Sequence, residues 1–590
     1  MKILSISLLL LLISLNCFAQ NFQLELKGIN ISENKILDSL NYISKHQNLK
    51  SIDDEITTAS EKLSKLGYLE NQFLEKIKIN DSCYSAKFRT GNKIKFIHIY
   101  IGEKSLFTKP LINQKNNVTE TENTTDNKNT IIRDLIGFNT GKDTLIVSFL
   151  EIESFLNESI QKLEQQGYAF AKLKLIHTKI KNKILLSELQ IELGTPKYLN
   201  EIVVKYANSD KKNSFPKGHL AQLNRKYQNR TFNKNSINEI YKDFEKLRFV
   251  SQIKYPEVLF TRDTTKVYVY LNERKSNTFD GFIGFANNES KKIRFNGYLD
   301  ATLENTLKLG EQFSLYWKSD GNDQKTFTTG IEIPYLFKSP IGIKAKIHIF
   351  KQDSIFQNIK TEINLGYYAD YNTRIFLGYQ STESSDIQNT NNINISDYNN
   401  SFVSSTLDYL KFDTQNATFS IKSKLFINLG IGKRTTNEFV VSSGAIKQFY
   451  VNLQATHNFY LNTKNCININ YHNYFLKSNT YLTNELYRFG GINSIRGFAE
   501  NNFQASFANA LQSEYRYIVS PNLYLYTLFD YCYYEDDSLN KKDNLTGLGL
   551  GFGLKTGNGL LKFAFANGKT KNENIELNKS IIHINYSLEF

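Results

Sequence analysis

The stretch Ile581–Phe590 reads Ile-Ile-His-Ile-Asn-Tyr-Ser-Leu-Glu-Phe and alternates between two kinds of side chain. A period of two places successive side chains on opposite faces of a β-strand. One face carries Ile582, Ile584, Tyr586, Leu588 and Phe590. The other face is mostly polar and requires water, whereas the apolar face requires a core or lipid. The stretch therefore predicts a strand that separates two different environments.

The same alternation recurs through residues 276–590, for example in Ile341–Ile349, where apolar residues alternate with Gly, Lys and His. Segments of about ten such residues, separated by polar turns, are typical of a transmembrane β-barrel. A closed barrel also leaves no backbone group unpaired in lipid. The alternative is a soluble all-β sandwich. The lack of any helical pattern in this region, behind a secretory signal, favours the barrel.

Composition agrees with strands that have two faces. The 590 residues have a mean hydropathy of -0.40, yet 13% of them are aromatic, with 35 Tyr and 42 Phe. Beyond the first 15 positions no apolar run approaches the roughly 20 residues of a membrane helix, which excludes a helical transporter. The net charge is +14, but the basic residues are dispersed, so we predict no nucleic-acid site.

The N-terminus predicts secretion. Lys2 precedes the apolar segment Ile3–Leu15, and Ala19 offers a small residue before a cleavage site, so residues 1–19 resemble a signal peptide. Lipidation of Cys17 stays open. The alternative to a signal peptide is a membrane anchor, but the segment Ile3–Leu15 is too short to span a bilayer. Cys83, Cys466 and Cys532 are odd in number and irregularly spaced, which does not indicate a disulfide framework. The eight His residues do not cluster at ligand spacing, so we predict no metal and no cofactor.

Before the barrel, one pattern occurs three times. An amphipathic helix ends in Leu66-Gly67-Tyr68 in the first copy and in Gln166-Gly167-Tyr168 in the second, whereas the third has Arg248 in place of the glycine. Glycine directly after a helix is typical of a left-handed C-terminal cap. Two strands follow each helix, so each unit is predicted to be β-α-α-β-β. The predicted helices cover residues 56–66, 152–163 and 237–247.

These features divide the chain into a signal peptide and four domains. The interval 113–129, rich in Asn, Thr and Glu, is interpreted as a polar surface insertion. The boundaries that we predict are 1–19 for the signal peptide, 20–91, 92–194 and 195–275 for three α+β domains, and 276–590 for the barrel.

One motif within the strand array resembles a known family. Tyr487-Arg488-Phe489-Gly490-Gly491-Ile492-Asn493-Ser494-Ile495-Arg496-Gly497-Phe498 is similar to the loop motif of the BamA/TamA outer-membrane assembly family, of the bacterial surface antigen type. Members of that family carry POTRA domains before a 16-stranded barrel. Further similarities follow in the family's order: Glu514–Tyr517, Leu528–Asp530 (with Cys532 where a glycine is usual), Gly547–Gly553 and the aromatic Phe590.

The resemblance implies a fold and a loop site. The fold class is a transmembrane antiparallel β-barrel of about 16 strands preceded by three α+β POTRA-like domains, a repeat count closer to TamA than to BamA. The resemblance places Arg496-Gly497-Phe498, with Gly490 and Gly491, on a long loop that folds back into the lumen. Side-chain parity points both Asp530 and Glu514 into the lumen as well. Arg496 is expected to pair with one of them; the alternative is that the charges are solvated separately.

The glycine-rich strand also has two interpretations. Gly547, Gly549, Gly551 and Gly553 form one bare face opposite a row of apolar side chains. Such a face permits close approach of another segment. The glycines would make room either for the inserted loop or for a bend in the barrel.

The resemblance further implies an outer-membrane assembly, insertion or translocation factor with N-terminal domains in the periplasm. Unfolded outer-membrane or surface proteins would add a strand to a POTRA-like sheet edge. They would then enter the seam between the first barrel strand, near Gly281, Phe282 and Gly284, and the last, which ends at Phe590. Accessory periplasmic or inner-membrane subunits and outer-membrane lipid are the other expected partners. Completion of backbone hydrogen bonds in lipid would drive insertion.

Two other classes of function compete with this interpretation. A two-partner-type secretion pore for a dedicated partner protein belongs to the same superfamily, but such pores usually carry two POTRA domains and a plug helix. An outer-membrane enzyme or passive porin is the second class. No catalytic constellation stands out, Gly-x-Ser-x-Gly is absent, and a porin has no use for POTRA-like repeats. We therefore predict that the protein is not an enzyme.

Overall fold

The computed structural model describes most of the chain. The predicted signal peptide, the polar insertion 113–129 and Phe590 lie outside the described residues. The described residues are 22–100, 144–207, 215–262, 264–287, 293–319, 324–388, 394–413, 419, 421–436, 445–556, 559–572, 576 and 580–589. They fall into two compact units, one that ends at Tyr198 and also holds residues 230–236, and one that holds the remainder.

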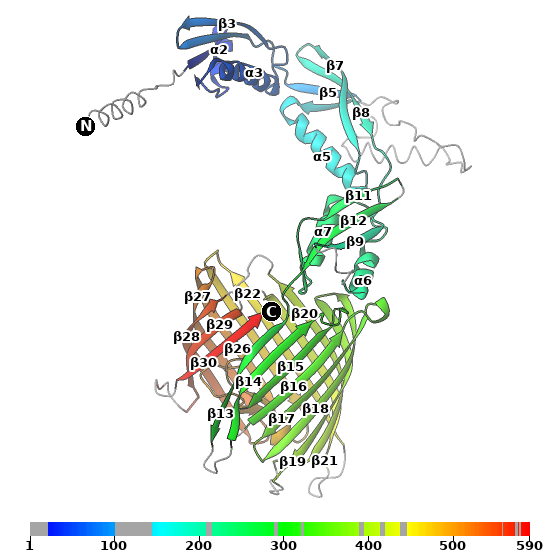
Figure 1. Ribbon diagram of the computed structural model, residues 1–590, viewed down its shortest axis with the longest axis vertical. Coiled ribbons are helices and arrows are strands. Elements are labelled where there is room, and N and C mark those ends of the chain that lie inside the picture. Colours follow the sequence, from blue (N-terminus) through cyan, green and yellow to red (C-terminus); the bar gives the residue numbers. More distant parts are fainter. Residues whose placement is uncertain are drawn as a thin grey trace, which may run out of the picture. The chain divides into compact units, whose positions relative to one another are not determined.

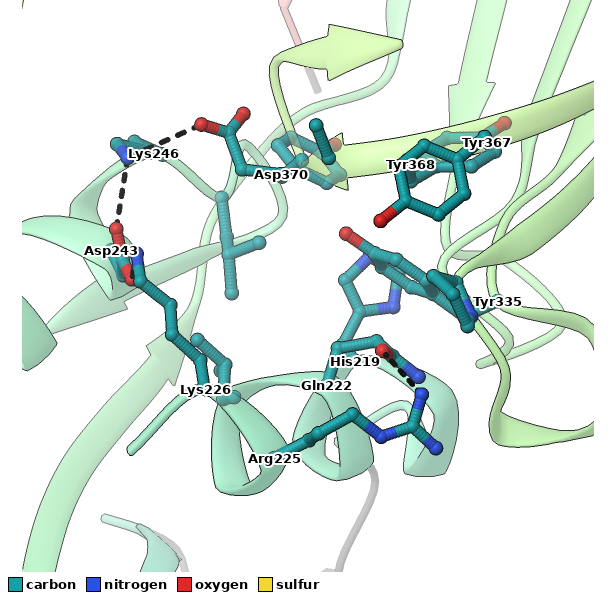
Figure 2. Close-up of a pocket in the computed structure, with 15 residues that line it drawn as sticks. His219, Gln222, Arg225, Lys226, Asp243, Lys246, Tyr335, Tyr367, Tyr368 and Asp370 are labelled. Atoms are coloured by element: carbon teal, nitrogen blue, oxygen red, sulfur yellow. Dashed lines mark hydrogen bonds and ion pairs between the residues drawn. The ribbon is translucent and has the colours of Figure 1, made fainter. Parts of the chain in front are cut away.

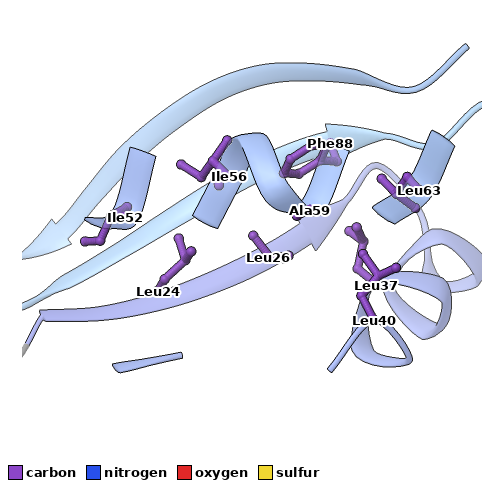
Figure 3. Close-up of a cluster of buried hydrophobic side chains, with 10 residues drawn as sticks. Leu24, Leu26, Leu37, Leu40, Ile52, Ile56, Ala59, Leu63 and Phe88 are labelled. Carbon is purple, nitrogen blue, oxygen red and sulfur yellow. The ribbon is translucent and has the colours of Figure 1, made fainter. Parts of the chain in front are cut away.

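The first α+β domain packs two helices on a four-stranded sheet of order β2-β1-β4-β3, in which β1 and β4 run parallel. Leu24 and Leu26 of β1 face Ile56 and Leu63 of the second helix across a closed apolar core (Figure 3). The elements are β1 (Phe22–Gly28), α2 (Ile31–Asp38), β2 (Lys45–His46), α3 (Leu49–Lys65), β3 (Gln72–Asn80) and β4 (Cys83–Arg89).

The repeated glycine has a structural role at the end of its helix. Asn48 caps the N-terminus of α3 by accepting a hydrogen bond from the Ser51 amide at 2.8 Å. After the C-terminus, Gly67 adopts φ +100°, and its carbonyl accepts a hydrogen bond from the Ile94 amide at 2.9 Å. Gly167, with φ +95°, accepts in the same way from Lys197 at 2.9 Å. Each glycine thus joins its helix end to the chain that leads into the next domain.

The second and third α+β domains repeat a parallel strand pair with helical segments between its strands. The second has sheet order β6-β5-β8-β7, and in the third β9 runs parallel to β12. The third also contains β11, a strand that the sequence analysis did not predict. The elements are β5 (Phe96–Tyr100), β6 (Thr144–Ser148), η1 (Phe149–Glu151), α5 (Ile152–Gln165), β7 (Lys172–Lys181), β8 (Ile184–Glu192), β9 (Glu201–Tyr206), α6 (Lys217–Tyr227), α7 (Lys234–Glu245), β10 (Val250–Gln252), β11 (Glu257–Phe260) and β12 (Thr265–Glu273).

Within the described residues, sixteen antiparallel strands close into a barrel (Figure 1). The predicted fold class, a β-barrel preceded by α+β domains, is confirmed. The strands are β13 (Thr278–Asn287), β14 (Ile293–Glu304), β15 (Gln312–Ser319), β16 (Gln324–Ile333), β17 (Ile341–Gln352), β18 (Phe356–Asp370), β19 (Thr373–Asp386), β20 (Tyr398–Phe412), β21 (Ile421–Thr436), β22 (Ile446–Tyr460), β23 (Asn465–Lys477), β26 (Phe507–Ser520), β27 (Leu523–Asp536), β28 (Lys541–Lys555), β29 (Gly559–Lys569) and β30 (Ile581–Glu589).

The two faces of the barrel wall differ as the alternation predicts. On β19, Leu377 is 64% exposed, whereas its neighbour Phe376 is buried. The outward face is a band of exposed apolar residues that includes Ile363, Leu365, Tyr367, Ile375, Leu377, Tyr379, Val403, Ile431, Leu525, Phe529 and Leu550. Among the described residues, no helix has the length and apolarity needed to cross a membrane.

We expect Gly67→Ala to destabilise the first α+β domain by about 1–2 kcal/mol, because an L-residue is strained at this backbone angle. A Cβ atom here would also lie 2.5 Å from the Ile94 carbonyl oxygen. Hydrogen exchange at the amides of Leu63 and Ile94 measures the effect. Lys65→Ala, at the exposed end of the same helix, is the control. Unchanged exchange in Gly67→Ala would contradict the assigned role.

Candidate functional site: the lumen loop and the barrel closure

A loop that joins β23 to β26 carries the sequence motif. It contains β24 (Tyr487–Phe489) and β25 (Phe503–Ala505), which pair with each other. Gly490, Gly491 and Gly497 all have positive φ, so the loop turns at the glycines of the motif. A Cβ at Gly497 would lie 2.5 Å from the Asn567 backbone carbon of β29. The tip of the loop therefore lies directly against the barrel wall.

Arg496 holds this tip to Asp530 of β27. Its Nε donates to Asp530 Oδ2 at 2.8 Å, and its Nη2 donates to Oδ1 at 2.6 Å, which is the bidentate geometry that favours arginine. The Arg496 backbone amide donates to Oδ2 as well, at 2.9 Å. One carboxylate thus fixes both the side chain and the backbone of the loop.

Glu514 of β26 is the second acceptor. Arg496 Nη1 donates to Glu514 Oε1, while Arg516 Nε donates to Glu514 Oε2 at 2.7 Å. The sequence left Asp530 and Glu514 as alternative partners for Arg496, and the structure brings all three residues together. The side chain of Arg496 is 4% exposed, and that of Asp530 is 1% exposed. Loss of one member would leave a buried charge uncompensated, at a cost of about 3–5 kcal/mol.

The glycines of β28 have two different roles. A Cβ at Gly547 would lie 2.3 Å from the Arg496 carbonyl oxygen, so this glycine makes room for the loop. A Cβ atom at Gly551 would instead collide with the ring of Tyr526, and one at Gly553 would collide with the ring of Tyr524. Room for the inserted loop, the first interpretation given from sequence, therefore applies at Gly547. At Gly551 and Gly553 the space is taken by tyrosine rings, and the bend in the barrel stays a prediction.

A second anchor of the same loop was missed from sequence. Glu485 forms an ion pair with Arg434 of β21, and both side chains are almost fully buried. The neighbouring Asn484 donates from Nδ2 to Ser384 Oγ at 2.8 Å. Parity alone places Arg434 on the lumen face, but nothing in the sequence names its partner. The loop is thus tied to the wall just before its hairpin, through Asn484 and Glu485, and at the tip of the hairpin, through Arg496.

Arg248, the residue that replaces the repeated glycine, connects the third α+β domain to the barrel. Its Nη1 donates to Glu304 Oε1 at 2.5 Å, and its guanidinium lies 5.2 Å from the ring centroid of Phe412. His219 of α6 packs edge-on against Tyr335, with ring centroids 4.7 Å apart, and also fills the space at Gly310. These contacts seat the third domain on the end of the barrel.

The barrel closes between β13 and β30 through three aligned residue pairs, Thr278–Asp280 against Ser587–Glu589. In contrast, β13 pairs with β14 along its whole length. The predicted seam residues Gly281, Phe282 and Gly284 follow directly in β13, and among the described residues they have register partners in β14 but none in β30. The closure is therefore short.

The described residues contain no group of three or more His, Cys, Asp or Glu side chains that could hold a metal ion. Cys466 and Cys532 are buried free thiols, and Cys83 is partly exposed.

We expect Arg496→Gln to destabilise the folded barrel by about 3–5 kcal/mol, because Asp530 stays buried without its cation. Adding Asp530→Asn should recover part of this loss. Urea unfolding in detergent, followed by the gel mobility of unheated samples, measures both. Arg488→Gln is the control: Arg488 faces the Phe356 ring at 5.6 Å and, in the described structure, forms no ion pair. Equal losses of stability in Arg496→Gln and in the control Arg488→Gln would contradict the pairing of Arg496 with Asp530.

We expect acidification to loosen the third domain from the barrel end. Burial lowers the pKa of His219 to about 3, against 6.5 for an exposed histidine. Below pH 6.5 the folded state therefore binds fewer protons than the unfolded state. The free energy of unfolding decreases as the pH is lowered, and at pH 5 it is about 2 kcal/mol below its value at neutral pH. Hydrogen exchange of α6 at pH 7 and pH 5, corrected for intrinsic rates, measures this. In His219→Phe the difference should vanish; if it persists, another group is responsible.

Several solved structures are similar to this chain. BamA from Haemophilus ducreyi lacking POTRA domains 1–3 is 15% identical, with 78% of this chain and 97% of that chain covered and a TM-score of 0.46. CdiB from Acinetobacter baumannii is 14% identical over 84% and 90%, and CdiB from Escherichia coli is 12% identical over 82% and 93%, each with a TM-score of 0.49.

No protein-family model matches the sequence, and neither does any curated protein. The preference for TamA over BamA from repeat count stays a prediction. The fold class rests on the sixteen-stranded closure itself.

Proposed function

We propose that the protein is an outer-membrane factor that assembles, inserts or translocates client proteins. In this proposal the barrel lies in the outer membrane, the α+β domains lie in the periplasm, and clients enter at the closure between β13 and β30. The single observation that carries the proposal is the shortness of that closure in an otherwise continuous ring of paired strands.

Lipid makes a short closure consequential. Unpaired backbone groups in the hydrocarbon region cost several kcal/mol each, because no water replaces the missing partner. Beyond Asp280, β13 offers the edge of Gly281–Asn287, whose described register partners all lie in β14. A client strand that paired with this edge would satisfy those groups. Insertion would then be downhill without a nucleotide, and no cofactor is required.

The α+β domains supply sheet edges for clients. The order β2-β1-β4-β3 leaves β3 at one edge of the first sheet. Phe73, Ile77 and Ile79 on this strand are 44%, 46% and 51% exposed. An unfolded client with apolar side chains could add a strand here, with main-chain hydrogen bonds providing affinity. Accessory periplasmic or inner-membrane subunits would use the same kind of surface.

A secretion pore for a dedicated partner protein is the second candidate. Two polar cavities of about 410 and 600 Å³ in the lumen favour it, since a translocating chain needs a hydrated path. Lys346 and Glu362 line the first cavity, and Arg496 and Lys562 line the second. In this case the lumen loop, rather than the seam, would have to move.

The test joins β13 to β30 by a disulfide. Phe279→Cys and Leu588→Cys are register partners, and Cys83→Ser removes the one partly exposed thiol among the described residues. Cells depleted of the native protein would carry the variant, and mass spectrometry would measure their outer-membrane proteins. We expect barrel proteins to fall at least fivefold when the disulfide forms and to recover with a reductant.

The matched control is Ile349→Cys with Ile359→Cys, a register pair of the fully paired strands β17 and β18. This disulfide should leave the outer-membrane proteins unchanged. If the seam disulfide leaves barrel proteins at normal levels, clients do not enter at the seam. The secretion pore would be favoured instead if a variant that releases the lumen loop, such as Arg496→Gln, lost a single secreted surface protein and kept normal levels of barrel proteins.

A further inference from the structure

A cavity of about 310 Å³ lies where the third α+β domain meets the barrel end (Figure 2). Helices α6 and α7 form one side. The other side consists of Tyr335, Pro340, the last residues of β18 from Tyr367 to Asp370, and Tyr371 directly after them. A cavity at this position is enclosed by protein on one side and adjoins the outward face of the barrel on the other.

The charges that line the cavity do not cancel. Asp243 accepts hydrogen bonds from Lys226 at 2.6 Å and from Lys246 at 2.8 Å, and Lys246 also lies 3.9 Å from Asp370. Arg225, in contrast, lies near only the Gln222 side-chain oxygen, at 3.4 Å, and has no carboxylate partner in the described structure. Three cations thus face two carboxylates, and the exposed guanidinium is the uncompensated charge.

The outer wall of the cavity continues the outward face of the barrel. Tyr367 is 51% exposed and lies on the same face of β18 as Ile363 and Leu365. In the neighbouring turn, Phe337 is 99% exposed and held at φ 52°. A fully exposed phenylalanine in a strained turn is costly in water but suits the headgroup level of a bilayer, where barrels carry their aromatic girdles.

The inner end of the cavity holds an unsatisfied polar group. His219 is 2% exposed, and neither ring nitrogen has a hydrogen-bond partner in the described structure. A buried imidazole N–H without an acceptor costs about 1–3 kcal/mol. An acceptor oxygen that entered the cavity would be able to satisfy it. The cavity therefore combines a cationic entrance, an apolar outer wall and a free donor at depth.

We propose that this cavity binds the headgroup of an anionic phospholipid of the adjoining leaflet, with the phosphodiester near Arg225 and Lys226 and the acyl chains along Tyr367. The inference rests on the proposed membrane location of the barrel but not on the insertion activity. Bound lipid would bridge the third domain and the barrel rim, so that the seating of this domain would depend on the leaflet.

The test uses the full-length protein in nanodiscs of phosphatidylcholine with 20% phosphatidylglycerol, and native mass spectrometry of the protein released from them. We expect retained phosphatidylglycerol to exceed its bulk share severalfold. In Arg225→Gln/Lys226→Gln the retained phosphatidylglycerol should fall to about its bulk share, because each basic residue near an anionic surface contributes a favourable charge interaction. Ala369→Phe, which fills the cavity without changing its charge, should have the same effect.

The matched control is Lys217→Gln/Lys242→Gln, which removes the same charge from exposed positions of α6 and α7 outside the cavity and should keep the excess. Equal loss in the control would overturn the proposal in favour of general surface attraction. Displacement of the lipid by millimolar inorganic phosphate would show a free-anion site instead. Failure to enter nanodiscs would count against the membrane location, whereas entry without lipid preference would refute this inference alone.

Discussion

Backbone hydrogen bonding in lipid is the constraint on which the rest of this structure depends. A strand in the hydrocarbon region must pair on both sides, and a closed ring of strands meets this demand. Fifteen of the strand-to-strand junctions follow chain order or skip only the lumen hairpin, and the sixteenth joins the two ends of the sheet. The short register at Thr278–Asp280 makes this last junction the weakest point of the ring.

The lumen loop reinforces one side of that junction. Arg496 is fixed to Asp530 and Glu514, and the backbone that follows lies against β28 at Gly547 and β29 at Asn567. These strands lead directly into β30. The C-terminal side of the closure is thus braced by buried charge pairs from inside the barrel. A short closure braced in this way would allow β13 to separate while the remaining wall keeps its shape.

Much of the architecture could be predicted from the sequence because it depends on local periodicity. The alternation in Ile341–Ile349 and Ile581–Phe590 depends on side-chain direction alone, and parity sufficed to place Asp530 and Glu514 on the lumen face. Partner choice could not be predicted. Glu304 lies 56 residues from Arg248, and no local pattern links the two. The only signal was that Arg248 replaces a repeated glycine.

The surroundings of the aromatic residues could not be predicted from the sequence either. The sequence analysis predicted apolar residues on the outward face, and Tyr515 and Tyr517 are indeed exposed there. Many other rings, however, point inward and fill the lumen, as Tyr524 and Tyr526 do beside the glycines of β28. Period-two parity gives the face of a residue, but it does not reveal whether a lumen tyrosine meets water, a loop or another ring.

Site-specific photocrosslinking tests the central claim most directly. A photoreactive residue in place of Phe282 would lie on β13 just beyond its register with β30, and one in place of Val403 would lie on the exposed face of β20, far from the closure in strand order. The account predicts adducts with newly made outer-membrane proteins at position 282 and few at position 403. Equal yields at the two positions, or no adduct at 282, would contradict it.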